Sequence, residues 1–229
     1  MNARRGGLEM RFRDREEAGR LLAERLREHV GETPVVLALP RGGVAVGYEV
    51  ARALDVPLDV MMVRKLGVPW HPELGMGALA EGGALYLNRE VLGSVDLTAE
   101  EIANVIAEET RELERRVQRY RGGRPLQDLR GRTVILVDDG LATGGTARAA
   151  VGALRGLGAR SVILAVPVAA SQTAEALRQE VDKLVCVQEP SDLWAIGTWY
   201  EDFHQMSDEE VLVLLDQAHR HLGASPASP

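Results

Sequence analysis

Two adjacent acidic residues followed by a glycine- and threonine-rich loop form the part of this chain best suited to chemistry. Residues 133–146 read Thr-Val-Ile-Leu-Val-Asp-Asp-Gly-Leu-Ala-Thr-Gly-Gly-Thr. The apolar run 134–137 is typical of a strand buried on both faces, so Asp138 and Asp139 should emerge at its carboxyl end, where open α/β sheets hold their ligands. Paired carboxylates at that place can accept hydrogen bonds from the vicinal hydroxyls of a sugar.

The loop after these acids offers a place for a phosphate. Residues 143–146 supply backbone N–H groups and two hydroxyls, and they lead into a predicted helix, 147–157, whose N-terminus favours an anion. The alternative is a plain turn in which Asp139 and Thr143 only cap that helix, although capping needs one acceptor rather than two acids and a Gly-Thr loop. A nucleotide-hydrolase P-loop is disfavoured because this loop ends Gly-Gly-Thr without a lysine.

A second anion loop is predicted after the apolar strand 35–39. Pro40 is followed by Arg41, Gly42 and Gly43, and then by another helical pattern. Glycines let the backbone approach a ligand, and an arginine can bind phosphate oxygens through two parallel hydrogen bonds. Taken alone, the motif is equally consistent with an ordinary glycine turn. A dinucleotide site is disfavoured because the Gly-x-Gly-x-x-Gly spacing is missing.

Together these segments resemble the signature of the type I phosphoribosyltransferases, which bind 5-phosphoribosyl 1-pyrophosphate (PRPP). The resemblance covers about residues 10–215 and is closest to small bacterial phosphoribosyltransferase-like proteins. It implies an α/β fold with a central, mainly parallel sheet flanked by helices, a small hood and a flexible flap. It also implies transfer of the phosphoribosyl group to a nitrogen acceptor, a nucleobase being expected, with release of pyrophosphate and with Mg²⁺ as cofactor.

The resemblance assigns roles to individual residues. Residues 41–43 would form the pyrophosphate loop, and Asp138 and Asp139 would hold the sugar and Mg²⁺, directly or through water. The implied catalytic residues are Arg41, Lys65, Asp138 and Asp139. The implied substrate-binding residues are Gly42, Gly43, Arg64, Gly140, Leu141, Ala142, Thr143, Gly144, Gly145, Thr146 and Trp194.

The flap is expected over about residues 64–83, a segment rich in glycine that is predicted to be a loop. Arg64 and Lys65 stand at its start, where the family's basic residues reach the pyrophosphate. Lys65 is one of only two lysines in an arginine-rich chain, which favours a specific role over a solvated surface position. His71 would lie on the flap, either beside the leaving group or in a rigid proline turn.

The acceptor is the least determined part of this interpretation. The segment 188–205 is loosely similar to the hood of hypoxanthine-type enzymes, in which an aromatic ring stacks on the base, so Trp194 or Trp199 could do this; core packing is the alternative for one of them. Ala142 stands where those enzymes often have an acid. Two other functions remain open on the same fold: a regulator that senses PRPP or nucleotides, and a hydrolase that cleaves them.

Alternating strands and helices predict a parallel sheet and one domain over residues 10–222, with disordered tails at 1–9 and 223–229. Capping boxes predict helices starting near Asp14 and Thr98, the second running to about residue 120. Further helices are predicted at 44–54, 172–180 and 208–221. The remaining strands are predicted at 58–63, 161–166 and 183–187.

Composition limits the partners and the location. The net charge of −7 argues against a nucleic-acid binder, which needs a basic face. No apolar run is long enough to cross a bilayer, and no secretory signal is evident, so a cytoplasmic protein without membrane contact is expected. The single cysteine, Cys186, is predicted to be a core residue. The long helix from Thr98 is a candidate surface for a homo-oligomer or for the hood.

Overall fold

A computed structural model describes residues 11–224, and its centre is a five-stranded parallel sheet with the strand order β2-β1-β6-β7-β8. The expected fold class is confirmed. The five strands are β1 (Val35–Ala38), β2 (Leu58–Val60), β6 (Thr133–Val137), β7 (Ser161–Val168) and β8 (Lys183–Gln188). The tails predicted to be disordered lie outside the described residues, except for residues 223 and 224, which end a helix.

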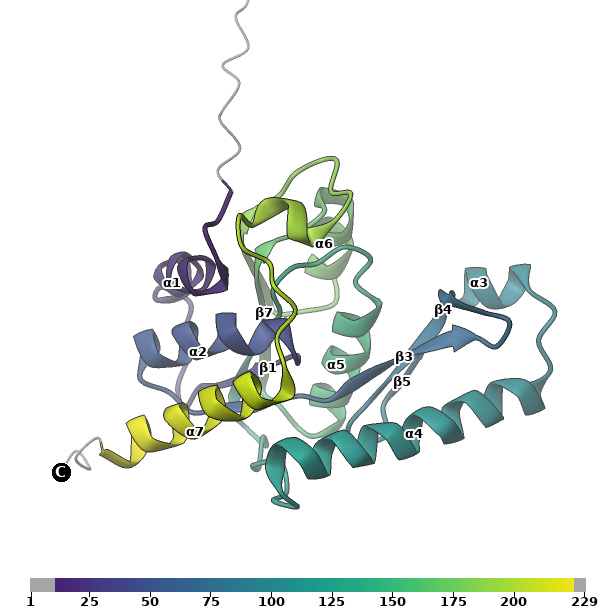
Figure 1. The fold of residues 1–229 in the computed structure, drawn as a ribbon, viewed down its shortest axis with the longest axis horizontal. Helices are drawn as coiled ribbons and strands as arrows, with labels where there is room; N and C mark the ends of the chain where they lie inside the picture. Colours follow the sequence, from purple (N-terminus) through teal and green to yellow (C-terminus); the bar gives the residue numbers. More distant parts are fainter. Residues whose placement is uncertain (1–10, 225–229) are drawn as a thin grey trace, which may run out of the picture.

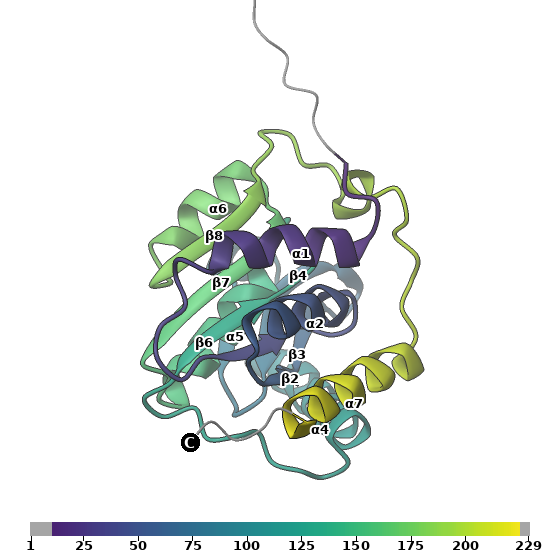
Figure 2. The ribbon, with the colours of Figure 1, turned by 90° about the vertical axis from the view of Figure 1, so that its left-hand side faces the viewer.

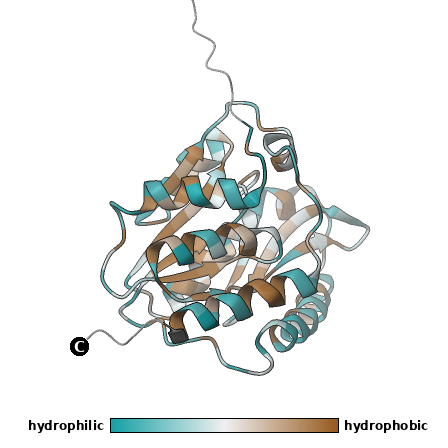
Figure 3. Cartoon of the chain, turned by 60° about the vertical axis from the view of Figure 1, so that its left-hand side comes forward, coloured by the Kyte–Doolittle hydropathy of each residue, from teal (hydrophilic) through white to brown (hydrophobic). Residues whose placement is uncertain are grey.

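Helices cover both faces of this sheet (Figure 2). On one face lie α1 (Arg15–Leu26) and α2 (Gly42–Leu54), with α7 (Asp208–Ala224) packed against α2. On the other lie α5 (Gly145–Gly156) and α6 (Ser171–Arg178). Along β6, Ile135 and Val137 join the first core, while Val134 and Leu136 join the second. A strand buried on both faces explains the unbroken apolar run, and Figure 3 shows brown strands behind helices in which teal and brown segments alternate.

The part of the chain between β2 and β6 forms a separate arm that extends away from the sheet (Figure 1). It consists of the antiparallel strands β3 (Val63–Val68), β4 (His71–Ala80) and β5 (Leu85–Leu87), followed by α3 (Arg89–Ser94) and the long α4 (Ala99–Arg121). On its inner side the arm packs against α5.

The prediction of a loop over residues 64–83 is therefore wrong, because most of this segment is a β-hairpin. Two of its glycines allow close approach of the strands. A side chain at Gly67 would place its Cβ 2.4 Å from the Pro72 carbonyl oxygen, and one at Gly77 would lie 2.3 Å from that of Tyr86. The glycines interrupt the apolar alternation by which a strand is recognised in sequence.

The predicted helix starts agree with the structure. The Asp14 side chain accepts a hydrogen bond from the Glu17 backbone at 2.7 Å, and Thr98 and Glu101 form the reciprocal capping box of α4. The remaining predicted strands and helices lie within a few residues of those observed, and the strand predicted at 58–63 ends at Val60. A short 3₁₀ helix, η1 (Ile196–Trp199), was not predicted.

The strand order reverses between β1 and β6. From β1 the chain proceeds to β2 on one side, whereas from β6 it proceeds through β7 to β8 on the other. Ligands of open α/β sheets bind at such a reversal, outside the carboxyl ends of the strands. Within the described residues, no helix has the length and apolar character needed to span a membrane.

Candidate functional site

The two predicted anion loops meet at the carboxyl edge of the sheet. Ala38 at the end of β1 is the register partner of Val137 at the end of β6, and the Leu39 N–H donates to the Val137 carbonyl at 2.8 Å. The predicted pyrophosphate loop after β1, which includes a cis peptide between Pro40 and Arg41, therefore lies beside the acids after β6.

The fit between this loop and the acids is close enough to require glycine. A Cβ atom at Gly42 would lie 1.9 Å from Oδ2 of Asp139, and one at Gly43 would lie 3.0 Å from Cα of Asp138. A distance below 3 Å is a steric clash, so Gly42 cannot carry a side chain without moving Asp139. The structure thus brings together four of the predicted site residues.

The acidic pair is partly buried and electrostatically unusual. Oδ1 of Asp138 accepts a hydrogen bond from the Asp139 N–H at 2.9 Å, and Oδ2 of Asp139 forms an ion pair with Nε of Arg15 at 2.9 Å. Burial, and then the neighbouring Asp139 carboxylate, raise the pKa of Asp138 well above its ordinary value. Burial also raises the pKa of Asp139, whereas Arg15 acts in the opposite direction. A cation placed beside Asp138 would favour its ionised form and lower its pKa again.

The predicted phosphate loop has a fixed backbone and free donors. The Leu141 N–H donates to Val168 at 2.9 Å and its carbonyl accepts from Ala170 at 2.9 Å, while the Thr173 hydroxyl donates to the Ala142 carbonyl at 2.6 Å. Gly140 packs on Ile196. Gly140 and Leu141 therefore shape the loop, and the Leu141 backbone groups are already used within the protein.

The next residues present their polar groups outward. Gly144 has a φ of +78°, and α5 begins after it without a side-chain cap, so the first N–H groups of the helix remain available. Thr143 is exposed and Thr146 is half-buried. The helix α2, which follows the pyrophosphate loop, also starts without a side-chain cap. Two helix N-termini with free N–H groups thus stand on either side of the acidic pair.

Lys65 lies across from the phosphate loop. It lines a cavity of about 360 Å³ between the arm and α5, together with Tyr86, Thr143, Thr146 and Arg148. The same ammonium group acts on Asp138, since its charge counters the rise in that residue's pKa caused by burial and Asp139. No hydrogen bond or ion pair of the Lys65 side chain is found within residues 11–224.

Arg64 points to the opposite side of β3. Its Nε pairs with the Glu109 carboxylate of α4 at 2.6 Å. Successive residues of a strand point to opposite faces, so Arg64 and Lys65 cannot both face the same ligand without a break in the strand. Arg64 is thus already paired with a residue of α4, and the structure does not bring it to the acidic pair.

Arg41 occupies the start of α2, near the contact between α4 and α7. Tyr120 of α4 donates a hydrogen bond to Asp208 of α7, and burial and this bond raise the pKa of Tyr120 to about 12. The positive charges of Arg116 and Arg41 oppose this rise, so Arg41 is near enough to act on Tyr120. Among the described residues, the Arg41 side chain has no hydrogen-bond or ion-pair partner. It is therefore available to an anion at the pyrophosphate loop.

The two candidate aromatic residues of the hood occupy different environments. Trp199 is only 7% exposed and packs with Phe12, Val168 and Tyr200, whereas Trp194 is 93% exposed. A cavity of about 330 Å³ runs from Ala142 to Trp194. Core packing therefore accounts for Trp199, and the ring available to a ligand belongs to Trp194.

Comparisons with known proteins show the family of this chain. Residues 13–202 match the Phosphoribosyl transferase domain family. This chain belongs to the phosphoribosyl transferase domain family. It is similar to a Mycobacterium tuberculosis protein described as a putative phosphoribosyl transferase, with 45% identity over 94% of this chain and 49% of that protein. The chain thus spans about half the length of the curated relatives it matches.

A solved structure gives the same fold. The crystal structure of TT1426 from Thermus thermophilus aligns with a TM-score of 0.78 and 44% identity, covering 91% of this chain and 99% of that one. The fold of this phosphoribosyl transferase domain is therefore shared along nearly its full described length.

The sequence-based prediction missed two residues that hold the acidic pair of this phosphoribosyl transferase domain. Arg15 reaches Asp139 from the N-terminal helix, and the Tyr200 hydroxyl donates to the Asp139 carbonyl at 2.6 Å. In sequence, Arg15 is an ordinary charged residue after a helix cap, and Tyr200 is one of several aromatic residues in a loop. Because both contacts join distant segments, no local pattern identifies them.

The acidic pair suits a hard cation only together with ligand oxygens. Carboxylate oxygens are ligands that Mg²⁺ accepts, and Asp138 has one carboxylate oxygen without a protein partner among the described residues. Within residues 11–224, no cluster of three or more acidic, histidine or cysteine side chains could hold a metal. Mg²⁺ is commonly bound by one or two carboxylates plus substrate phosphates, and this domain fits that arrangement.

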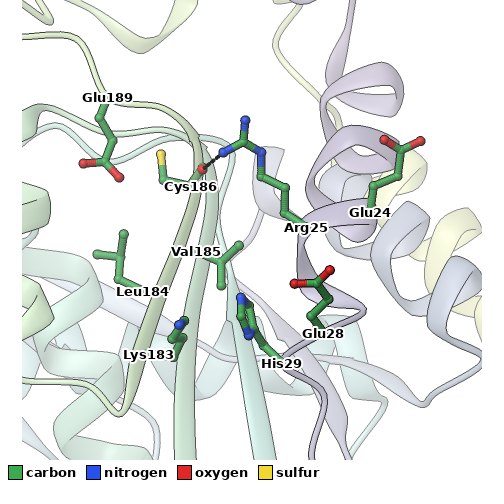
Figure 4. Close-up of a pocket in the computed structure, with 9 residues that line it drawn as sticks. All are labelled: Glu24, Arg25, Glu28, His29, Lys183, Leu184, Val185, Cys186 and Glu189. Atoms are coloured by element: carbon green, nitrogen blue, oxygen red, sulfur yellow. Dashed lines mark hydrogen bonds between the residues drawn. The ribbon is translucent and has the colours of Figure 1, made fainter.

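A further cavity, of about 500 Å³, lies between α1 and the edge strand β8 (Figure 4). Arg25 of α1 donates to the Cys186 carbonyl of β8 at 3.1 Å, and Lys183 and His29 lie at the lower end of the view. None of the predicted site residues lines it. This cavity therefore does not belong to the candidate site.

Proposed function

We propose that this domain transfers the 5-phosphoribosyl group of PRPP to a nitrogen acceptor and releases pyrophosphate. The observation that carries the proposal is the junction of Gly42 with Asp139, which places the acidic pair between two helix N-termini that lack side-chain caps. A sugar bearing an anionic group at each end matches that order of groups. A ligand with a single phosphate, or a plain helix-capping turn, would involve only one of the two loops and would not account for the other.

In this proposal each end of PRPP has its own binding elements. Residues 143–146 bind the 5′-phosphate through backbone N–H groups and hydroxyls. Asp138 accepts hydrogen bonds from the ribose hydroxyls. Arg41 and the N–H groups of Gly42 and Gly43 bind the pyrophosphate.

The chemistry asks mainly for charge stabilisation and orientation. The bond between the anomeric carbon and the pyrophosphate oxygen breaks as the acceptor nitrogen bonds to that carbon, and the sugar takes on oxocarbenium character. Arg41 and the α2 N-terminus stabilise the negative charge that develops on the leaving group. The grip on the 5′-phosphate supplies binding energy that orients the remote reacting carbon. When bound by Asp138 and substrate oxygens, Mg²⁺ would neutralise charge on the pyrophosphate.

The acceptor is proposed to lie in the cavity between Ala142 and Trp194. The exposed indole of Trp194 offers a flat apolar face, and base stacking on an aromatic ring needs no particular hydrogen-bond pattern. Gln172 and Asp192 line the same cavity and could bind the edge of a base. A planar nitrogen heterocycle, such as a nucleobase, is the acceptor class that suits this lining.

The test is pyrophosphate release from PRPP and Mg²⁺, measured with and without a panel of nucleobases. Release that depends on one base supports the transferase. Base-independent release would show a hydrolase, and tight PRPP binding without release would show a sensor. Absence of PRPP binding would contradict all three functions.

We expect Asp138→Asn to lower PRPP affinity by about tenfold to hundredfold, the usual effect of losing a charge-assisted hydrogen bond. The fold should persist, since the amide oxygen can still accept from the Asp139 N–H. Titration calorimetry with Mg²⁺ measures the affinity. Asp216→Asn, an exposed acid of α7 paired with Arg220, is the control that should leave it unchanged. Equal PRPP affinity in wild type and Asp138→Asn would remove the central assignment.

A further inference from the structure

The two acids at the sheet edge are held differently. Asp139 is fixed from both ends, because Nε of Arg15 pairs with its carboxylate at 2.9 Å and the Tyr200 hydroxyl donates to its carbonyl at 2.6 Å. The side chains of Arg15 and Asp139 are only 9% and 14% exposed. Among the described residues, the Asp138 side chain has no ion pair, and the hydrogen bond it accepts comes from the next N–H in the chain.

Arg15 is itself held in one orientation. Its Nη1 donates to the His204 carbonyl at 2.9 Å, and its guanidinium carbon lies 3.9 Å from the centre of the Phe203 ring. The Asp14 cap fixes the start of the helix that carries it. A planar guanidinium restrained by a carboxylate, a carbonyl and an aromatic face cannot turn freely, so it fixes the Asp139 carboxylate as well.

This ion pair also supports the pyrophosphate loop. A Cβ atom at Gly42 would lie 1.9 Å from Oδ2 of Asp139 and 2.9 Å from Nε of Arg15, so the loop backbone rests directly on both groups. Moving either side chain would change the surface on which the loop lies. Arg15 therefore joins α1, the pyrophosphate loop, the end of β6 and residues 200–204 at one point.

We propose that Arg15 is a positioning residue of the PRPP site. It neutralises and immobilises Asp139 against Gly42, whereas Asp138 has no ion pair among the described residues and presents its negative charge to the ligand. Without Arg15, the two adjacent carboxylates would repel each other more strongly, and the Asp139 carboxylate would lose the contact that fixes its orientation. The inference rests on the proposed function, because it concerns the binding of the same substrate.

The first experiment measures PRPP affinity by calorimetry in the presence of Mg²⁺. Arg15→Met should lower the affinity by about tenfold to hundredfold, and Arg15→Lys should recover part of this loss because it restores the charge but not the planar contact. Arg20→Met is the matched control, since Arg20 is a half-exposed arginine of the same helix that pairs only with Glu16 and Glu49 among the described residues. It should bind PRPP like the wild type.

A chemical rescue separates positioning from a purely structural role. A cavity of about 470 Å³, lined by Arg15, Ala45 and Met206 among others, gives small molecules access to the position that Arg15→Ala would vacate. Methylguanidinium should restore part of the PRPP affinity of Arg15→Ala, whereas urea, which is planar but uncharged, should not. Rescue by methylguanidinium would not be expected if the variant had simply lost its fold.

A milder variant keeps the inference testable if Arg15 variants do not fold. Phe203→Leu removes the ring beneath the guanidinium and should lower PRPP affinity by about twofold to fivefold, the usual effect of a surface cation–π contact. The inference is overturned if folded Arg15→Met or Arg15→Ala binds PRPP like the wild type, if neither lysine nor methylguanidinium restores any affinity, or if Phe203→Leu changes nothing. Failure of the wild-type protein to bind PRPP would instead contradict the proposed function.

Discussion

Gly42 is the residue at which the two halves of the candidate site touch. Its missing side chain leaves the space that the Asp139 carboxylate and the Arg15 guanidinium occupy. Glycine is required here by the lack of space and not by an unusual backbone angle, because Gly42 is the first residue of α2 and has a helical backbone. Any larger residue must displace a charged pair, so Gly42 links the position of the pyrophosphate loop to that of the acids.

We expect Gly42→Ala to lower PRPP affinity at least about tenfold and the free energy of unfolding by about 1–3 kcal/mol, the usual cost of overpacking. Gly152→Ala is the matched control, because a Cβ there meets nothing within 4 Å in the helix α5. It should raise the free energy of unfolding by about 0.5–1 kcal/mol and leave the affinity unchanged. Denaturant titration and calorimetry measure the two quantities. Normal binding by Gly42→Ala would show that the loop tolerates a displaced Asp139.

Arg41 should act on one end of the substrate only. Its position at the start of α2, without a hydrogen-bond or ion-pair partner in the described part of the chain, predicts that Arg41→Ala weakens pyrophosphate and PRPP binding by about tenfold or more. Ribose 5-phosphate, which lacks the pyrophosphate, should bind nearly as before. Competition titration with the three ligands distinguishes these effects, and equal losses for all three would contradict the assignment.

At the residue scale, candidate site residues could be predicted from the sequence where they belong to one contiguous motif. Asp138 and Asp139, the Gly-Thr loop and the Arg41 loop are each contiguous, so their residue types and order were informative. Arg15 and Tyr200 reach Asp139 from 124 and 61 residues away. Contacts of that kind depend on how helices and loops close over the sheet, which no local pattern encodes.

At the element scale, the arm is the part of the site that differs most from the prediction made from the sequence. Strands β3 to β5 pack against α5, the helix that follows the phosphate loop, and so bring Lys65 opposite Thr143 and Thr146. The family resemblance had placed Lys65 at the pyrophosphate. In the structure Lys65 lines the cavity beside Thr143 and Thr146, so we propose that it contacts the 5′-phosphate end, while α4 holds Arg64 on the other face of the same strand.

Lys65→Met should therefore lower the affinities for PRPP and for ribose 5-phosphate by a similar factor, about tenfold, because both ligands carry the 5′-phosphate. Lys65→Arg should retain most of the binding. The only other lysine, Lys183 on β8, provides the control, and Lys183→Met should bind both ligands normally. If ribose 5-phosphate binds Lys65→Met like the wild type while PRPP does not, Lys65 acts on the pyrophosphate after all.

Helix boundaries were predictable because capping is local. Asp14 and Thr98 each bond to an N–H three residues ahead, and both helices start where these residues indicated. The hairpin of the arm was not predictable, because Gly67 and Gly77 interrupt the alternation of buried Leu66, Val68 and Met76. Glycine required by close strand contact looks the same in sequence as glycine in a flexible loop.

At the scale of the whole molecule, the site follows from the strand order. Placing β1 beside β6 brings together two loops that are nearly a hundred residues apart, and helices on both faces bury every residue of β6. The parallel sheet itself was predictable from the alternation of strands and helices. The resemblance to TT1426 extends over the same elements, at 91% of this chain.

The buried thiol of Cys186 reports on the integrity of this sheet. Burial raises its pKa to about 12, and its Sγ lies 3.0 Å from the Gln188 carbonyl on the edge strand. At pH 8 a thiol with that pKa is ionised about a thousandfold less than an ordinary cysteine. We therefore expect a disulfide reagent to label the native protein at least about a thousandfold more slowly than the denatured chain, with a rate that rises with pH. Rapid labelling of native protein at pH 8 would show that β8 opens.

The most direct test of the account is a crystal structure with PRPP and Mg²⁺ bound. We predict the 5′-phosphate against residues 143–146, the ribose hydroxyls on Asp138, the pyrophosphate along Arg41, Gly42 and Gly43, and Asp139 still paired with Arg15. A complex in which PRPP leaves residues 143–146 empty, or in which Asp138 makes no contact with the sugar, would contradict the central claim.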